Sequence, residues 1–324
     1  MMEIRNSIYF PLVCALALSA SSCIRDEILS CPPLSVRVEV TDKNYFNVHE
    51  TALEEPVDEN LPFAGYISSL RYTLKNIATG DVVERKDVRN FTSGEKLFRI
   101  DFCDTLPHGT YVLTVFADGR TEKPLMFDET KYQISVSYDL YITEKPLMFD
   151  ETGENLKLHP DSSEGGDTYL TTDTLVYDAW SYDYAVGLER VKGKLLVLME
   201  NLPSDCAVAD HSVKGLYDHV TPSFIYKGQS AVMKSLSVSE QDHASVLSGT
   251  LLSPSAGGGE SVFSLSLKDN AGSVLPGPHD SAVKVSIRRN ELTLLRYSYG
   301  SGGKLVISLY VNDHWEVVHG MEID

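Results

Sequence analysis

The chain has 324 residues, a length typical of about two domains, and 43% of them are hydrophobic, enough to bury a core. Acidic residues number 46 against 28 basic ones, which gives a net charge of −18. This balance excludes a surface that follows nucleic-acid phosphates, so we expect no nucleic-acid partner, and it argues against electrostatic docking on anionic lipid.

The N-terminus has the organisation of an export signal. The apolar run Ser7–Ala20 is too short to span a bilayer but fits the apolar region of a secretory signal. Small residues then lead to Cys23, an order that resembles a bacterial lipobox, in which the cysteine becomes the lipidated N-terminus. We therefore predict a lipoprotein signal peptide at 1–22 and lipidation of Cys23. The alternative is an ordinary signal peptide cut near Ala20 that leaves Cys23 as a free thiol.

Residues 23–33 read as a lipidated tether that ends in two prolines. Short runs of alternating or dense apolar residues follow, with Gly, Pro, Asn and Asp between them, and no long helical period intervenes. This pattern predicts an all-β chain of sandwich or barrel architecture. The predicted strands include Leu34–Thr41, 70–74, 98–102, Gly109–Ala117, 134–142, Lys192–Met199, Ser223–Tyr226, Val262–Leu267, Val283–Ile287 and Leu305–Val311.

A ten-residue sequence, TEKPLMFDET, occurs twice, at 121–130 and at 143–152. Two copies with different flanks indicate a local duplication and not a solenoid. Only one copy can hold the original structural place. We expect the other to lie in a surface excursion, where insertions are tolerated.

The best candidate for a domain boundary is 161–173, which is rich in Ser, Gly, Asp and Thr. The predicted organisation is therefore an N-terminal β-sandwich at 34–160, a linker at 161–173 and a C-terminal β-sandwich at 174–324. A polar linker has few buried contacts, so we expect a protease to separate the two domains there.

Motifs for catalysis or metal binding are absent from the sequence. The chain has no phosphate loop, no HExxH, no GxSxG and no acidic calcium loop. The segments 257–259 and 300–304 are glycine-rich, but they lack the spacing of a phosphate loop. We expect no catalytic residue, no metal and no cofactor, and hence a protein that is not an enzyme.

Several segments in order resemble the FimB/Mfa-type fimbrial anchor lipoproteins (minor fimbrial subunits) of Bacteroidales. They are the lipobox with Cys23, then SCPP before VRVEV, LPHGTYVLTVF at 106–116, LERVKGKLLV at 188–197, NLP at 201–203 and FIYKG at 224–228. The resemblance implies two tandem transthyretin-like (Greek-key) β-sandwich domains. It also implies a non-enzymatic protein that is anchored in the outer membrane through Cys23, is exposed on the surface and is part of a fimbrium.

The same resemblance implies partners and a mode of binding. A protein of this family attaches a fimbrial shaft to the cell and helps to set its length, and its shaft subunits join by strand complementation. Since Cys23 holds the N-terminus at the membrane, we expect the docking edge in 170–324, near Val262–Leu267, Val283–Ile287 or Leu305–Val311.

The alternative function is a surface glycan-binding outer-membrane lipoprotein, which would also be all-β. Such a protein needs exposed aromatic residues that are presented together. The chain has two tryptophans, Trp180 and Trp315, and 17 tyrosines.

Three cysteines remain besides Cys23 and Cys14 of the signal. An exported chain favours a disulfide over a metal site, and three thiols allow one pair. We predict Cys31 with Cys103, both in the first domain, with Cys206 as the alternative partner.

Overall fold

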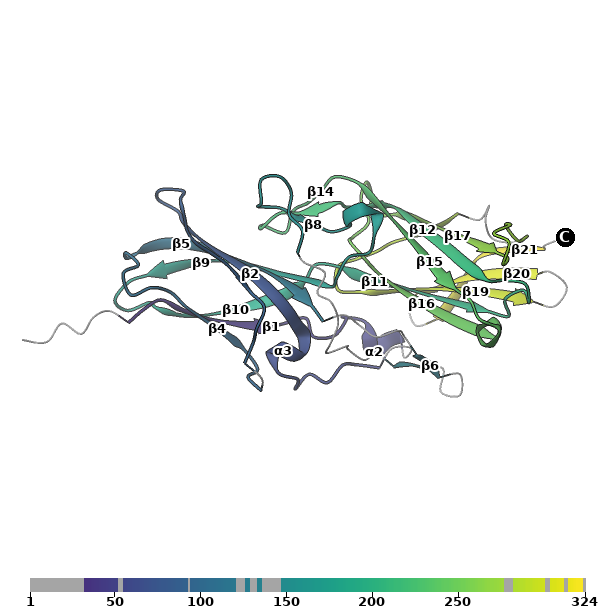
Figure 1. Cartoon of the computed structure of the whole chain (residues 1–324), viewed down its shortest axis with the longest axis horizontal. Helices are drawn as coiled ribbons and strands as arrows, with labels where there is room; N and C mark the ends of the chain where they lie inside the picture. The colour runs from purple at the N-terminus through teal and green to yellow at the C-terminus, as the bar shows by residue number, and fades with distance from the viewer. Residues whose placement is uncertain are drawn as a thin grey trace, which may run out of the picture.

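The computed structural model describes residues 32–51, 55–92, 94–120, 126–128, 133–135, 147–276, 282–300, 304–311 and 314–322. Their secondary structure is almost entirely β, and two sandwiches lie end to end (Figure 1). The expected all-β fold with two sandwich domains is confirmed.

The first sandwich is built from one seven-stranded sheet in the order β3-β2-β5-β9-β10-β1-β4. Its strands are β1 (Ser35–Val40), β2 (Ile67–Asn76), β3 (Val82–Val88), β4 (Phe98–Asp101), β5 (Gly109–Gly119), β9 (Thr168–Tyr177) and β10 (Asp183–Arg190). β10 runs parallel to β1 along most of its length and meets β9 only at Glu189 and Arg190. The sheet therefore folds over on itself at β10 and encloses a core.

The alternation of β1 shows why this sheet closes over a core. Val36, Val38 and Val40 face inward, while Arg37 and Glu39 face solvent. These valines pack against buried residues of β2 and β5, such as Leu74 and Leu113. The sequence pattern thus fixes the buried face.

The second sandwich has two separate sheets around its own core. The five-stranded sheet has the order β16-β11-β19-β20-β21, with β11 (Gly193–Glu200), β16 (Ser245–Leu252), β19 (Leu292–Gly300), β20 (Lys304–Val311) and β21 (His314–Glu322). The four-stranded sheet has the order β15-β12-β17-β18, with β12 (Val208–Leu216), β15 (Ser230–Ser237), β17 (Ser261–Lys268) and β18 (Val283–Val285).

Smaller elements complete the described fold. Two small sheets have the orders β14-β13-β8 and β6-β7, from β6 (Met126–Asp128), β7 (Gln133–Ser135), β8 (Leu156–Lys157), β13 (His219–Val220) and β14 (Tyr226–Lys227). The helical turns are α2 (Val48–Thr51), α3 (Phe63–Tyr66), η1 (Pro160–Ser162) and η2 (Glu240–His243). No described helix is long and apolar enough to cross a membrane.

The predicted boundary at 161–173 lies too early. β9 begins at Thr168 and pairs with β5 over ten residues, and β10 pairs with β1, so both strands belong to the first sandwich. The segment reads as a linker because Thr and Asp are common in loops. However, Thr is β-branched and suits a strand when neighbouring strands cover it. We infer that the first sandwich ends near Arg190.

The second copy of TEKPLMFDET packs against the folded body. Leu147 and Phe149 contact an apolar cluster, the Phe149 and Phe116 rings meet edge to face at 5.3 Å, and Arg71 lies 4.4 Å from the centre of the Phe149 ring. In the described part of the first copy, Met126–Asp128 pairs with β7 and comes close to β16. The second copy therefore occupies an integrated place, and most of the first copy lies outside the described residues.

Candidate functional site

The free edges of the sheets are the first candidate sites, because an unpaired strand can accept another chain. Two of the three predicted docking runs are not edges. β17 lies between β12 and β18, although β18 pairs only with Ser261–Phe263 of β17, and β20 lies between β19 and β21. Of the three runs, only Val283–Ile287 contains an edge strand, the short β18.

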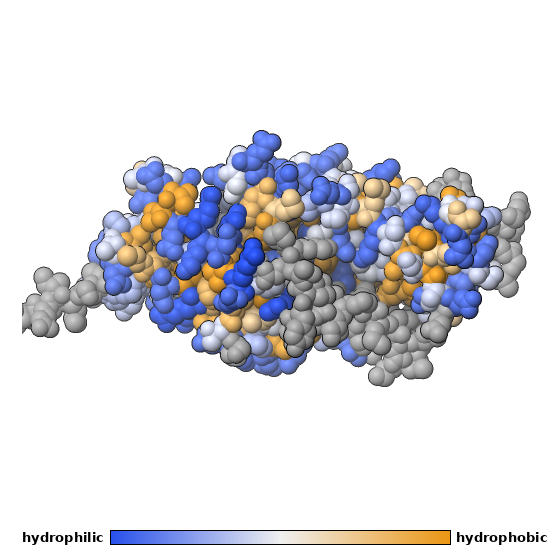
Figure 2. Space-filling model, in the orientation of Figure 1, coloured by the Kyte–Doolittle hydropathy of each residue, from blue (hydrophilic) through white to orange (hydrophobic). Residues whose placement is uncertain are grey.

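Most edge strands of the three large sheets carry charged side chains, which oppose pairing with another chain. β3 has the consecutive charged residues 84–87, and Figure 2 shows hydrophilic side chains gathered around β2 and β3. β4, β15, β18 and β21 also contain charged residues, among them Lys234 in β15 and Lys284 in β18.

β16 differs from these edges. Its eight residues, SVLSGTLL, include no charge and no proline. Within the described residues it pairs with β11 on one side and with no strand of its sheet on the other. β16 therefore lacks the charged residues that protect the other edges, although β6 comes close to it.

An ion pair closes part of the β16 edge. The Lys234 ammonium, from β15 in the opposite sheet, lies 3.2 Å from the Glu164 carboxylate and donates to the main-chain oxygen of Gly249. The same carboxylate accepts a 3.2 Å hydrogen bond from the main-chain N–H of Leu251. We call Lys234 and Glu164 the edge clasp. Their side chains occupy the donor and acceptor positions that the main chain of an added strand would take.

The inner face of β16 covers a neutral histidine. His211 is buried, and its Nε2 lies 3.4 Å from the hydroxyls of Ser248 and Thr250. Burial lowers the pKa of His211 to about 4, so the ring is uncharged at neutral pH. The clasp therefore places two charged groups on the edge of β16, whereas the histidine beneath that edge is neutral.

A shallow hollow of about 340 Å³ lies across β12, β15 and β17. It is lined by Asp210, His211, Ser212, Met233, Lys234, Ser235, Ser264, Leu265 and Ser266. No tryptophan or tyrosine is among these residues, and Trp180 lies in the other sandwich. The hollow therefore lacks the aromatic platform that the glycan-binding alternative needs.

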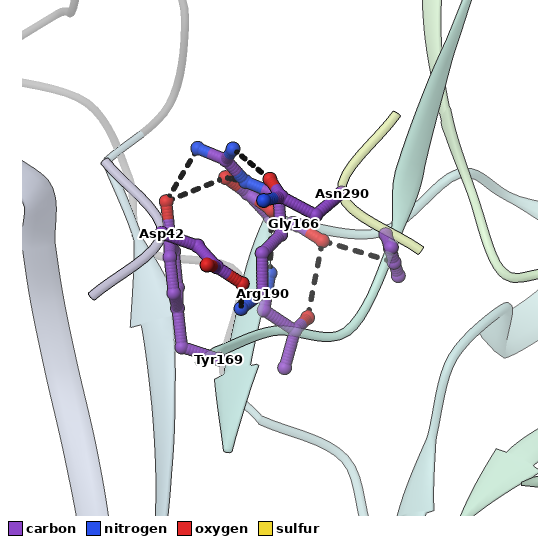
Figure 3. Close-up of polar contacts among 8 residues, drawn as sticks. Asp42, Gly166, Tyr169, Arg190 and Asn290 are labelled. Carbon is purple, nitrogen blue, oxygen red and sulfur yellow. Dashed lines mark hydrogen bonds and ion pairs between the residues drawn. The ribbon is translucent and has the colours of Figure 1, made fainter. Parts of the chain in front are cut away.

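The second candidate site is a buried polar cluster where the two sandwiches meet (Figure 3). Arg190, at the end of β10, is only 1% exposed, and its Nε lies 2.9 Å from the Asp167 carboxylate. It also donates to the Tyr169 hydroxyl at 2.7 Å and to the Asn290 side-chain oxygen at 2.9 Å. Since Asn290 comes from the second sandwich, Arg190 bonds the two halves directly.

Further groups saturate this cluster. The Tyr45 ring lies 4.2 Å from the Arg190 guanidinium, and the Asp42 carboxylate accepts from the Arg190 main-chain N–H. Burial raises the pKa of Asp42, opposed by its interactions with Arg190. Lys192 donates to the main-chain oxygens of Glu164 and Gly166. Every charge has its partner within the fold, so the cluster is a structural joint and offers no open position for a substrate.

The segment 42–51 strengthens the joint from the other side. The Asn47 amide donates to the Leu292 oxygen at 2.9 Å, and its side-chain oxygen accepts from the Leu292 N–H at 2.8 Å. Tyr45 and Val48 pack against Leu196 and Leu294 of the five-stranded sheet. Polar and apolar contacts thus hold the sandwiches in one orientation.

The cysteine predictions are only partly covered by the structure. Cys23 and Cys31 lie outside the described residues. Cys103 is exposed and Cys206 is buried in the second core, and they are not bonded to each other. Hydrogen bonds from Thr105 lower the pKa of the Cys103 thiol, which favours its reactive thiolate. The Cys31–Cys103 pair stays a prediction.

The sequence also predicts that the chain has no catalytic residue, no metal and no cofactor. Among the described residues, no group of three or more His, Cys, Asp or Glu side chains is arranged to hold a metal ion. Sequence reasoning missed Glu164, Lys234 and Arg190, because their hydrogen-bond partners lie 15 to 148 residues away along the chain. The one signal available was the run of charges in 189–194, ERVKGK, between two apolar segments.

Comparisons with known proteins identify solved structures that resemble this one. No family model matches the chain, and no curated protein matches it. A candidate polysaccharide-binding protein from Bacteroides thetaiotaomicron has a similar structure, with a TM-score of 0.50, 12% identity, and coverage of 88% of this chain and 98% of that one.

Two further structures are similar at lower scores. The fimbrial anchor protein Mfa2 from Porphyromonas gingivalis gives a TM-score of 0.45 and 11% identity over 89% of this chain and 96% of that one. A fimbrial assembly protein from Parabacteroides distasonis gives 0.39 and 12% identity over 90% and 98%. The chain shares the overall fold of the Bacteroides thetaiotaomicron protein across nearly the full length of both.

Proposed function

We propose that this protein is a lipid-anchored subunit that attaches a fimbrial shaft to the outer membrane. Lipid on Cys23 holds the first sandwich at the membrane, and the second sandwich presents the β16 edge to a strand of a shaft subunit. The edge of β16, which carries no charged residue and is flanked by no second strand of its sheet among the described residues, is the observation that carries the docking part of this proposal.

The end-to-end arrangement supports a role as a connector. β1 begins at the outer end of the first sandwich, and β19 to β21 extend to the opposite end of the molecule (Figure 1). A lipid joined to the segment before β1 would therefore place the second sandwich away from the membrane. The buried joint around Arg190 would transmit a pull along the shaft to the anchored half.

Strand addition at β16 agrees with the chemistry of the edge. An incoming strand would offer an N–H to the Gly249 oxygen and a carbonyl to the Leu251 N–H, in place of the clasp. The clasp side chains are each only about a quarter exposed, so they would have to turn away together. Among the described edge strands of the three large sheets only β16 is uncharged, so each anchor would hold one shaft and thereby limit the number of fimbriae.

The function is binding and not catalysis. The sequence lacks a catalytic motif, and the polar cluster at the joint is closed by its own residues. The solved structures named above are described by fimbrial or polysaccharide-binding roles, and none of the three is described as an enzyme.

The anchoring half is tested by Cys23→Ser. We expect the variant to lose labelled fatty acid and to leave the membrane fraction, while Cys103→Ser, the matched control, keeps both. Deletion of the gene should cause fimbriae to be lost or shed, as seen by electron microscopy. Normal lipidation of the Cys23→Ser variant would contradict the anchor, and unchanged fimbriae would contradict the function.

The docking half is tested at main-chain positions. Leu251→Pro removes an N–H that faces the free side of β16, a change that an edge strand tolerates, whereas Lys284→Pro makes the same change on the β18 edge. We expect the first variant to fail to capture the purified shaft subunit and the second to capture it normally, with both folded by circular dichroism.

A substitution in the edge clasp gives a second test, in which capture of the shaft subunit should increase. Lys234→Met, which has no N–H donor on its side chain, should free the Gly249 oxygen and increase capture several-fold. Normal capture by a folded Leu251→Pro variant would exclude β16, and loss of capture in Lys284→Pro alone would assign docking to β18.

A further inference from the structure

The turn between β9 and β10 presents aromatic side chains to solvent. Trp180 is 91% exposed and Tyr182 is 37% exposed. Val176, just before the turn, is also exposed, and so is Ile77 of the neighbouring β2–β3 turn. Exposed residues of this size on one end of a sandwich are unusual in a protein that meets only water.

The turn holds Trp180 outward by a defined geometry. The Asp178 carboxylate accepts hydrogen bonds from the main-chain N–H groups of Trp180 and Ser181, both at 2.8 Å. The Asp178 N–H in turn donates to the Ser181 oxygen at 3.1 Å. These bonds lower the pKa of Asp178, so the carboxylate is ionised and the turn is stable at neutral pH.

The turn lies where the chain enters the first sandwich. The Ser35 N–H donates to the Tyr182 oxygen at 2.8 Å, and the Tyr177 hydroxyl donates to the Pro32 oxygen at 3.1 Å. Pro32 is nine residues after Cys23, a segment that spans at most about 30 Å when fully extended. A lipid on Cys23 therefore keeps this turn within about 30 Å of the bilayer and permits direct contact.

We infer that Trp180 and Tyr182 insert into the headgroup region of the membrane that carries the lipid anchor. This inference rests on the proposed lipidation of Cys23. Tryptophan and tyrosine prefer the interface between water and lipid, because one part of the ring is apolar and the other is polar.

Charge does not drive this contact. The carboxylate of Asp178 is used by the turn, and that of Asp183 lies 3.3 Å from the Arg37 guanidinium. The aromatic side chains are then a second attachment beside the lipid. A lipid on a tether leaves the molecule free to tilt, and insertion of the turn holds the long axis away from the membrane.

The chain has two tryptophans, so Trp315 can serve as the control for Trp180. Trp315, on β21, packs against Tyr310 in the second sandwich, far from this end. We use two full-length lipidated variants, Trp315→Phe and Trp180→Phe, each of which keeps one tryptophan. Each variant is reconstituted into phosphatidylcholine vesicles with or without brominated acyl chains, because bromine quenches the fluorescence of a nearby tryptophan. Flotation shows whether each variant is bound to the vesicles.

We expect at least a twofold loss of fluorescence, with a blue-shifted emission, for Trp180 in the Trp315→Phe variant. Trp315 in the Trp180→Phe variant should show no quenching. If the protein floats with vesicles and Trp180 is not quenched, the inference is wrong while the lipid anchor stands. If the protein does not float, both are wrong.

Discussion

At the scale of single residues, the described structure depends on buried charges that are fully partnered. The Arg190 side chain combines an ion pair, hydrogen bonds to Asn290 and Tyr169, and two aromatic neighbours, Tyr45 and Tyr169, in a position almost without solvent. Such a pair adds little to stability when it is compared with apolar residues, but removal of one partner leaves an uncompensated buried charge.

Arg190→Met should therefore destabilise the protein by about 3–5 kcal/mol, since Asp167 remains buried without its cation. The measurement is the free energy of unfolding in urea. Arg99→Met is the control, because its pair with Asp101 is more than half exposed, and it should leave the midpoint almost unchanged. Equal effects of the two variants would contradict a joint that depends on Arg190.

A second residue-scale prediction concerns acid. His159 is buried, its Nε2 accepts from the Ser253 N–H at 2.9 Å, and burial lowers its pKa from 6.5 to about 3. Between about pH 6.5 and pH 3, His159 therefore binds a proton in the unfolded chain but not in the folded chain. Stability should fall between about pH 6.5 and pH 3, by at most about 1.4 kcal/mol per pH unit from this group.

His159→Gln, which keeps an acceptor for Ser253, should reduce this slope in unfolding experiments at a series of pH values. His49→Gln, at an exposed position in α2, should follow the wild-type slope. An unchanged slope in the His159 variant would show that protonation of this ring is not linked to folding.

At the scale of elements, the two copies of TEKPLMFDET place the same residue, Phe127 or Phe149, in the same local sequence but at different positions in the fold. Phe149→Ala should cost about 2 kcal/mol, below the value for a fully buried phenylalanine, because the ring is only partly buried against Phe116 and Arg71. Phe127→Ala, the same residue in the first copy, should cost much less.

Thermal unfolding of both variants distinguishes the two places. An equal loss of stability in the two variants would mean that both copies are integrated into the fold. A larger loss in Phe127→Ala would assign the original place to the first copy.

At the scale of the whole molecule, the joint makes the two sandwiches one unit. Asp167 and Thr168 are buried, and Lys192 bonds the main chain at Glu164 and Gly166. We now expect a non-specific protease to leave 161–173 intact, contrary to the expectation from composition, because a protease needs an extended, accessible segment.

Mass spectrometry of the fragments checks this prediction. Lys192→Met should make the segment susceptible, since the two carbonyls lose their donor, whereas Lys284→Met, at an exposed ion pair, should not. Two stable fragments from the wild-type protein that meet within 161–173 would contradict the joint.

Local sequence patterns are sufficient to predict the fold class and the buried faces. Alternation along Leu34–Thr41 and Gly109–Ala117 places apolar side chains on one side of each strand, and this local property survives in the structure as β1 and β5. The same pattern found β17, β18 and β20, but the tertiary structure decided which of them are edges. Pairing order is a property of the whole sheet, and alternation is the same in an edge strand and in a central one. The contacts of Glu164, Lys234 and Arg190 were decided in the same way, because they form only when segments far apart in the chain are brought together by the packing of the two sandwiches.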